Sequence, residues 1–299
     1  DIEIILPTEG TFADDFLADT AAMTIKVGDY LSEDILEKET VRASAALRNM
    51  GYYEFSKNNF FFEADTLTDP GSAILKMTIN GYTRNETPER DRPINKFTFN
   101  EVSISYPQTL KIREKILKEL NTIRPGETYS TNVVNNTYSR LSSLRMFSSV
   151  NIGMTPVDSN QIDCHINLSQ SKLQGFKVNL EASTNSTGLF GISPQLSYYH
   201  KNIFHGGEWL NLGFMGNFQF KFKDAVRSNE FGVSAGLSFP RFLGLPYRHF
   251  KGAIPRTDIN ISYNYQNRPE YTRNIISTSY GYNGNVNNRI FYQVYPVQL

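Results

Sequence analysis

The sequence contains a single cysteine, no long hydrophobic segment and no excess charge of either sign. The lone Cys164 excludes a disulfide framework within the chain, and we expect it to fill a core. No run approaches the roughly 18 consecutive apolar residues of a membrane-spanning helix. The net charge is zero, which gives no electrostatic case for binding nucleic acid. No signal peptide is visible at Asp1, so we expect a secreted chain to be a mature or trimmed form.

Arrangements of residues that would support catalysis are also missing. His200 and His205 flank a short segment, but no cysteine or carboxylate set completes a metal site around them. The serine pairs at 142–143 and 148–149 lack a neighbouring His/Asp arrangement. The glycines at 206–207 do not precede a helix, so they do not predict a phosphate-binding loop. We therefore expect no catalytic residue, no metal, no cofactor and no enzymatic activity.

Charge and aromatic content change near residue 173. Residues 1–173 hold 18 Lys/Arg and 24 Asp/Glu, whereas residues 174–299 hold 12 and 6. The second part also has 23 of the aromatic residues against 16 in the longer first part. This change in composition predicts two different kinds of domain.

The second part alternates apolar and polar residues over long segments. In "GEWLNLGFMGNFQFKF", Leu210, Leu212 and Phe214 alternate with polar or small residues, which is the pattern of a β-strand. Related patterns predict about seven strands, many near the 9–11 residues that cross a bilayer at a tilt. The strands are expected at 175–184, 189–200, 207–222, 229–239, 257–267, 272–283 and 289–297.

The apolar face of these strands could contact lipid or a protein core, since a soluble β-sandwich also alternates. Three features favour lipid. The strands are long and have almost no helix between them, their polar face is rich in Asn, Ser, Gln and Gly, and Tyr and Phe gather toward strand ends. A bacterial barrel has an even number of strands and no open edge, so we expect the barrel to continue beyond Leu299.

The first part contains the same order of elements twice. A strand at 96–104, helices at 110–120 and 130–147, and a closing strand pair at 149–157 and 161–169 give the order β-α-α-β-β. The same order fits residues 2–80, where "IKVGDYL" corresponds to "IRPGETY" and Gly51 is placed to end a helix. The charged segment 81–95 separates the copies. The predicted domains are 1–81, a linker at 82–94, 95–172, and 173–299.

These tandem modules, with a Gly-Asp or Gly-Glu turn before the second helix, resemble POTRA domains. Followed by a membrane barrel, they resemble the BamA/TamA superfamily of outer-membrane assembly barrels, within the bacterial surface antigen family. "NIFHGGEWLNL" is similar to the Asn-Leu-Phe-Gly-x-Gly-Glu turn of that family, with matches at Asn202, Phe204, Gly207 and Glu208, whereas His205 replaces a usual glycine. The stretch from "FPRFL" to "SYGYN" resembles Bacteroidetes TamA-like proteins. The Arg-Gly-Phe/Tyr loop motif of the family is absent, and we expect it further along the barrel.

The resemblance implies two α+β POTRA domains followed by a transmembrane antiparallel β-barrel. It implies location in the bacterial outer membrane with the POTRA domains in the periplasm. The implied partners are unfolded outer-membrane protein clients, the lipid bilayer and periplasmic or lipoprotein accessory subunits. Client strands would pair with an open sheet edge, or else neighbouring modules would cover that edge. The candidate edge residues are Asn59, Phe60, Phe61, Phe62, Ser149, Val150, Asn151 and Ile152. The barrel seam would begin at the strand that carries Phe176, Val178, Leu180 and Ala182.

Three functions compete at this point. The first is an assembly or insertion factor for outer-membrane proteins. The second is a secretion pore of the two-partner type for one dedicated client, which shares the architecture. The third is a soluble β-rich adhesin, which would need a covered apolar face.

Overall fold

The computed structural model describes residues 1–8, 10–66, 71–88, 91–158, 160–184, 189–221, 227–244, 253–286 and 290–299. Two compact units divide the chain: residues 1–103, 122–135 and 152–166 form one, and residues 104–121, 136–151 and 167–299 form the other. The described strands form two three-stranded sheets and one seven-stranded sheet.

The first module contains two helices and a three-stranded sheet. Its elements are β1 Ile2–Ile5, α1 Phe12–Asp19, a 3-10 turn at Thr20–Ala22, α2 Glu33–Asn49, a 3-10 turn at Lys57–Asn59, β2 Phe60–Asp65 and β3 Ile74–Ile79. The order in the sheet is β1-β3-β2, with β1 parallel and β2 antiparallel to β3. The predicted β-α-α-β-β order for residues 2–80 agrees with these elements.

Capping residues and apolar spacing explain why α2 forms where it does. The Ser32 side chain accepts a hydrogen bond from the Ile35 N–H at the start of the helix. Gly51 follows the helix with a φ of 119°, a conformation that favours glycine. One side of the helix places Ala43 and Leu47 in a core that both helices and the sheet share. The core comprises Phe12, Phe16, Ala43, Leu47, Tyr52, Phe55, Phe60, Met77 and Ile79.

The second module repeats this arrangement. Its elements are β4 Thr98–Ser105, α3 Glu114–Leu120, α4 Thr131–Ser142, β5 Phe147–Asp158 and β6 Gln161–Gln170, with the sheet order β4-β6-β5. The Ser103 side chain hydrogen-bonds to His165, and two residues further on Ser105 hydrogen-bonds to Asn167. Because the residue numbers increase together on both strands, β4 and β6 are parallel. Cys164 is fully buried in β6, as expected for a cysteine that fills a core.

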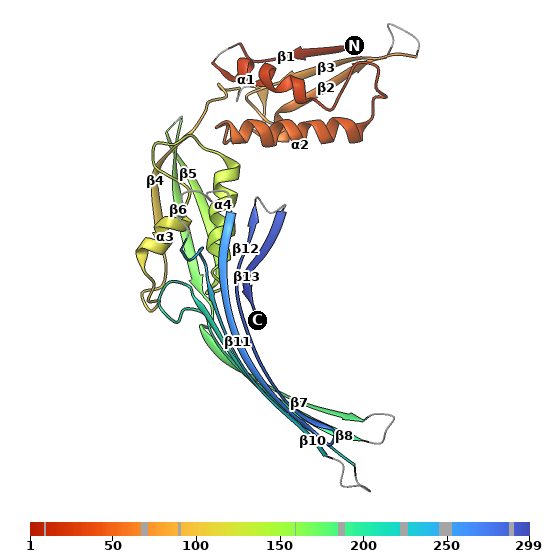
Figure 1. Cartoon of the computed structure of the whole chain (residues 1–299). Coiled ribbons are helices and arrows are strands. Elements are labelled where there is room, and N and C mark those ends of the chain that lie inside the picture. The colour runs from red at the N-terminus through yellow and green to blue at the C-terminus, as the bar shows by residue number, and fades with distance from the viewer. Residues whose placement is uncertain are drawn as a thin grey trace. The chain divides into compact units, whose positions relative to one another are not determined.

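The seven-stranded sheet is antiparallel throughout, and its strands are neighbours in chain order. Figure 1 shows its strands as long and curved. They are β7 Gln174–Thr184, β8 Phe190–His200, β9 Trp209–Phe220, β10 Arg227–Phe239, β11 Ala253–Arg268, β12 Tyr271–Val286 and β13 Ile290–Gln298. All seven predicted strands are present. The described strands form an open sheet rather than a closed barrel, because β7 and β13 are its two edges and do not pair. None of the helices in the described ranges is both long and apolar enough to span a membrane.

Candidate functional site

The two faces of the large sheet differ sharply in chemistry. On one face the strand register aligns an apolar row over six strands, from β7 to β12. This apolar row consists of Val178, Leu196, Phe214, Val233, Tyr263 and Ile276, whose exposed fractions run from 42% to 74%. In each strand, a residue next to the one in the apolar row faces the opposite side of the sheet. These residues form a polar row of Lys177, Ser197, Gly213, Ser234, Ser262 and Ser277. Such exposure shows that no protein layer within the described residues covers the apolar row.

Strand β7 carries the predicted seam residues along an open edge. Leu173 accepts a hydrogen bond from the Lys201 N–H at 2.7 Å, so odd-numbered residues of β7 pair with β8. The even-numbered residues therefore direct their backbone N–H and C=O groups to the open edge. These include Phe176, Val178 and Leu180, each more than 70% exposed, and also Ala182. Whether a client strand pairs here stays a prediction.

Strand β2 lies at one edge of the first module's sheet, and its hydrogen bonds show which residues face that edge. The Asn80 N–H donates to the Asn59 carbonyl, so Phe61, Glu63 and the other odd-numbered residues of β2 pair with β3. On the far side of β3, Leu75 donates to Asp1, which agrees with the same alternation. The backbone groups of Phe60, Phe62 and Ala64 therefore point away from β3, toward the open edge.

Two of the predicted edge residues have other roles in this strand. Asn59 precedes β2 and is 4% exposed, and its side chain donates to the carbonyls of Asn80 and Tyr82. Asn59 is therefore a buried residue that links the start of β2 to the segment after β3, and it is not an exposed edge residue. Phe61 directs its backbone toward β3. Phe60 and Phe62 are thus the predicted residues of this strand whose backbones face the edge.

In the second module, β5 is also an edge strand and contains the predicted residues Ser149, Val150, Asn151 and Ile152. Ser149 and Asn151 are exposed, whereas Val150 and Ile152 are half-buried. The module thus presents a second sheet edge on the strand that corresponds to β2. Client binding at β5 remains a prediction.

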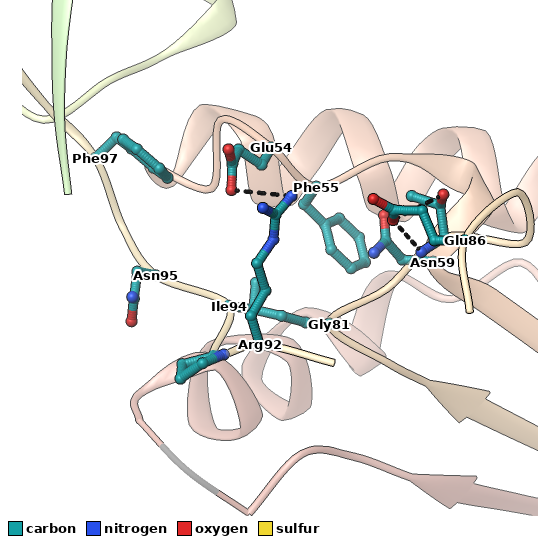
Figure 2. A pocket seen from close by; sticks show the side chains of 11 residues that line it. Glu54, Phe55, Asn59, Gly81, Glu86, Arg92, Ile94, Asn95 and Phe97 are labelled. Atoms are coloured by element: carbon teal, nitrogen blue, oxygen red, sulfur yellow. Dashed lines mark hydrogen bonds and ion pairs between the residues drawn. The ribbon is translucent and has the colours of Figure 1, made fainter. Parts of the chain in front are cut away.

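The segment after β3 folds back onto the first module. The Gly81 N–H donates to Asp91 at 2.9 Å, and Arg92 lies 3.6 Å from the carboxylate of Glu54. Ile94 packs against the module's core. Figure 2 shows Glu54, Arg92 and Ile94 around a small pocket, with Arg92 directed at Glu54. The predicted linker is therefore held against the first module by specific contacts in its described part.

The turn between β8 and β9, residues 202–208, is a buried hydrogen-bonded unit. Asn202 and Glu208 are each 2% exposed. Asn202 accepts from the Gly207 N–H at 2.9 Å, and Glu208 accepts from the Gly206 N–H at 2.8 Å. These two polar side chains therefore hold the turn in one conformation.

The same turn is tied to the segment before α3. Asn202 donates to the Lys111 carbonyl at 2.7 Å, and Arg113 forms a 2.6 Å ion pair with Glu208. The Arg113 N–H also donates to the His205 carbonyl at 2.9 Å. The turn at residues 202–208 thus connects the segment that precedes α3 to the large sheet.

Backbone geometry explains two positions of this motif. Gly207 has a φ of 77°, and a Cβ at this position would lie 2.7 Å from the Leu144 side chain. His205 has a φ of 63°, in the left-handed region that glycine favours. The family turn that this segment resembles has glycine at the position of His205, and the backbone here keeps a glycine-like conformation.

Sequence patterns did not identify Arg113 or the contacts of the linker. Arg113 lies 95 residues before its partner Glu208, and no local pattern reports such a pairing. Glu208, by contrast, stands out in the sequence through its place in the motif. Within the described residues, no three His, Cys, Asp or Glu side chains gather as a metal site.

Comparisons with known proteins give alignments to solved structures only. No family model matches the sequence, and no curated protein matches it. BamA from Haemophilus ducreyi lacking POTRA domains 1-3 aligns with 95% of this chain and 58% of its own, at 13% identity and a TM-score of 0.49. CdiB from Acinetobacter baumannii aligns with 95% and 57%, at 12% identity and a TM-score of 0.42. POTRA3-5 of Haemophilus influenzae BamA aligns with 56% and 59%, at 13% identity and a TM-score of 0.40.

The chain spans less than two thirds of each of these three structures, with 57% to 59% of their lengths aligned.

Proposed function

We propose that the chain is part of an outer-membrane factor of the BamA/TamA superfamily that assembles or inserts other outer-membrane proteins. The exposed apolar row from Val178 to Ile276 carries this proposal, because it runs unbroken over six strands opposite a row of small and polar residues. A sheet with one apolar and one polar face suits a wall between lipid and water. A self-contained soluble sandwich would bury that row instead.

In this proposal the large sheet lies in the outer membrane and the two modules lie in the periplasm. The family subtype would be the Bacteroidetes TamA-like one suggested by the sequence around residues 239–283. The protein would act by binding and positioning rather than by bond chemistry. Client strands would pair with the backbone edges of β2, β5 and β7, since main-chain hydrogen bonds tolerate varied client sequences.

Pairing at the edge of β2 can be tested with a proline substitution that spares the fold. The Ala64 N–H faces the open edge, so Ala64→Pro removes an outward donor and leaves the β2–β3 bonds in place. Benzoylphenylalanine replaces Glu63, whose side chain is 78% exposed, and captures a biotinylated peptide of eight alternating Val and Thr residues. The full chain in detergent micelles should crosslink this peptide, and Ala64→Pro should reduce the yield at least fivefold.

Matched variants and controls define the outcome of this experiment. Lys76→Pro should unfold the sheet, because Lys76 pairs with Glu63 inside the ladder. Circular dichroism should show that the Ala64→Pro chain remains folded. An equal crosslinking yield with Ala or Pro at position 64 would contradict pairing at β2.

A dedicated secretion pore is the second candidate, since two modules with open edges would serve one client as well as many. Depletion of the protein separates the two functions. Loss of many outer-membrane proteins supports an assembly factor, whereas loss of one secreted protein supports a dedicated pore.

A further inference from the structure

Arg84 in the linker contacts the same edge of β2 that the proposed function assigns to clients. Its backbone N–H donates to the Asn58 carbonyl at 2.9 Å. Its Nε donates to the Phe60 carbonyl at 2.9 Å. Asn58 lies in the 3-10 turn that leads into β2, whereas the Phe60 carbonyl is the first acceptor of the strand that faces away from β3. One linker residue therefore holds both the turn before the strand and the first outward acceptor of the edge.

The N-terminal end of this edge is satisfied within the chain. The Phe60 N–H donates to the Lys57 carbonyl in the preceding 3-10 turn, and its carbonyl is taken by Arg84. Further along the strand, Phe62 and Ala64 have outward backbone groups with no backbone partner among the described residues. The edge thus divides into a closed part that ends at Phe60 and an open part at Phe62 and Ala64.

We propose that Arg84 is a register stop, which confines an extended segment of an unfolded client polypeptide to the open part of β2. Because a strand is added through alternate residues, a client that pairs with Phe62 and Ala64 makes its next bond at Phe60. The guanidinium of Arg84 holds that acceptor, so the added strand ends there. Arg84 thereby sets both the length and the register of the paired segment.

This inference rests on the proposed pairing of clients with β2, and it assigns a specific role to a residue outside the strand. A linker that merely joins two modules would not need to donate to the sheet edge. Arg92 provides a comparison, since it is a second linker arginine that contacts Glu54 rather than β2. The two arginines carry the same charge and differ in whether they contact the edge.

The experiment compares Arg84→Ala and Arg92→Ala in the full chain in detergent micelles. The probe is a fluorescein-labelled peptide of eight alternating Val and Thr residues, capped at both ends. Fluorescence anisotropy gives its dissociation constant, and hydrogen–deuterium exchange of the bound peptide counts its protected amides. Arg84→Ala should tighten binding about three- to tenfold, as expected for one more hydrogen bond, and should protect one more peptide amide. Arg92→Ala should change neither quantity.

Other variants keep the outcomes distinct. Arg84→Lys keeps a donor near the Phe60 carbonyl and should bind the peptide like the unmodified chain. If Ala64→Pro abolishes binding but Arg84→Ala leaves affinity and protection unchanged or weakens binding, the register stop is wrong and pairing at β2 stands. If the unmodified chain does not bind the peptide, both the pairing and the register stop are wrong.

Discussion

Glu39 shows how one buried carboxylate connects a helix to the segment before it. It is 1% exposed on α2 and accepts from both the N–H and the hydroxyl of Thr24, each at 2.7 Å. Arg42, one turn further on, lies 2.6 Å from Glu39 and also pairs with Asp19 at 2.7 Å. Burial alone would raise the pKa of Glu39, but the hydrogen bonds from Arg42 and Thr24 outweigh it and leave the pKa below its ordinary value of 4.5.

The lowered pKa of Glu39 predicts how the stability of the first module depends on pH. A carboxyl whose pKa is lower in the folded state stabilises that state fully above its unfolded value, and this contribution is lost as pH falls through the folded value. Glu39→Gln should therefore cost about 1–3 kcal/mol in the free energy of unfolding near pH 7. The cost should shrink as the pH drops below about 4.5, the ordinary value.

Urea unfolding at pH 7, 5 and 3, followed by circular dichroism, measures this difference. Glu37→Gln is the matched control, since Glu37 lies on the same helix with a 62% exposed side chain and should give little change at any pH. A cost for Glu39→Gln that stays constant from pH 7 to pH 3 would contradict the role of the ionised carboxylate.

At the scale of elements, the end of α2 depends on a single glycine. Gly51 has a φ of 119°, and a Cβ at this position would lie 2.7 Å from the Thr128 side chain. Its carbonyl also accepts from the Phe97 N–H at 2.9 Å. The helix end and the entry to the second module are therefore both fixed at a residue that cannot carry a side chain without strain.

Alanine substitutions at Gly28 and Gly51 separate the cost of a steric clash from the cost of backbone strain. Gly28 also has a positive φ of 94°, but a Cβ there would meet nothing within 4 Å. Gly28→Ala should cost about 1 kcal/mol from backbone strain, whereas Gly51→Ala should cost about 2–4 kcal/mol because it adds a steric clash. Urea midpoints of the two variants provide the test, and equal costs would show that the space around Gly51 adjusts freely.

The long strands could be predicted because their signal is local. Alternation placed β9 and β10 within a few residues of their observed ends, and the repeated turn at Gly28 and Gly126 revealed the two modules. Both glycines have positive φ angles, as such turns need. Alternation failed to show the full length of β11, which begins at Ala253, because Ile254 and Pro255 interrupt the pattern.

The contacts that define the candidate site are not local, which is why sequence patterns missed them. Arg84 reaches a carbonyl 24 residues earlier, and Arg113 reaches a carboxylate 95 residues later. Charged residues in a linker are usually solvated, and nothing in the neighbouring sequence separates Arg84 from Arg92. The direction of backbone groups along β2 also requires the observed hydrogen bonds, since alternation of side chains does not show which neighbour a strand has.

At the scale of the whole molecule, the large sheet combines two surfaces that need different surroundings. The apolar row would be costly in water over six strands, and the polar row on the opposite face would be costly in lipid. The proposed membrane assembly factor would meet both needs, with hydrocarbon against the apolar row and water against the polar row. An exposed apolar row of this length would make a soluble protein prone to aggregation.

Two neighbouring residues on β10 test the placement of this sheet in lipid. Val233 belongs to the apolar row and Ser234 to the polar row, so a lysine at each position carries the same charge on opposite faces. On a lipid face near the middle of a bilayer, lysine costs about 2–4 kcal/mol, whereas it is tolerated on the water-filled side. Val233→Lys should therefore lower the fraction of the full chain that folds into phosphatidylcholine vesicles, while Ser234→Lys should leave it near that of the unmodified chain.

The folded fraction can be measured by the slower gel migration of unheated against heated samples, or by protection from added protease. Equal folding of the Val233→Lys and Ser234→Lys chains would mean that the two faces do not meet different solvents. Folding of the unmodified chain in buffer without detergent or lipid would have the same meaning. Because the apolar row is exposed in the structure, water would then have to contact side chains such as Phe214 and Ile276, at 53% and 70% exposure, without driving the chains together. The strong hydration cost of such a surface is why we expect lipid to cover it.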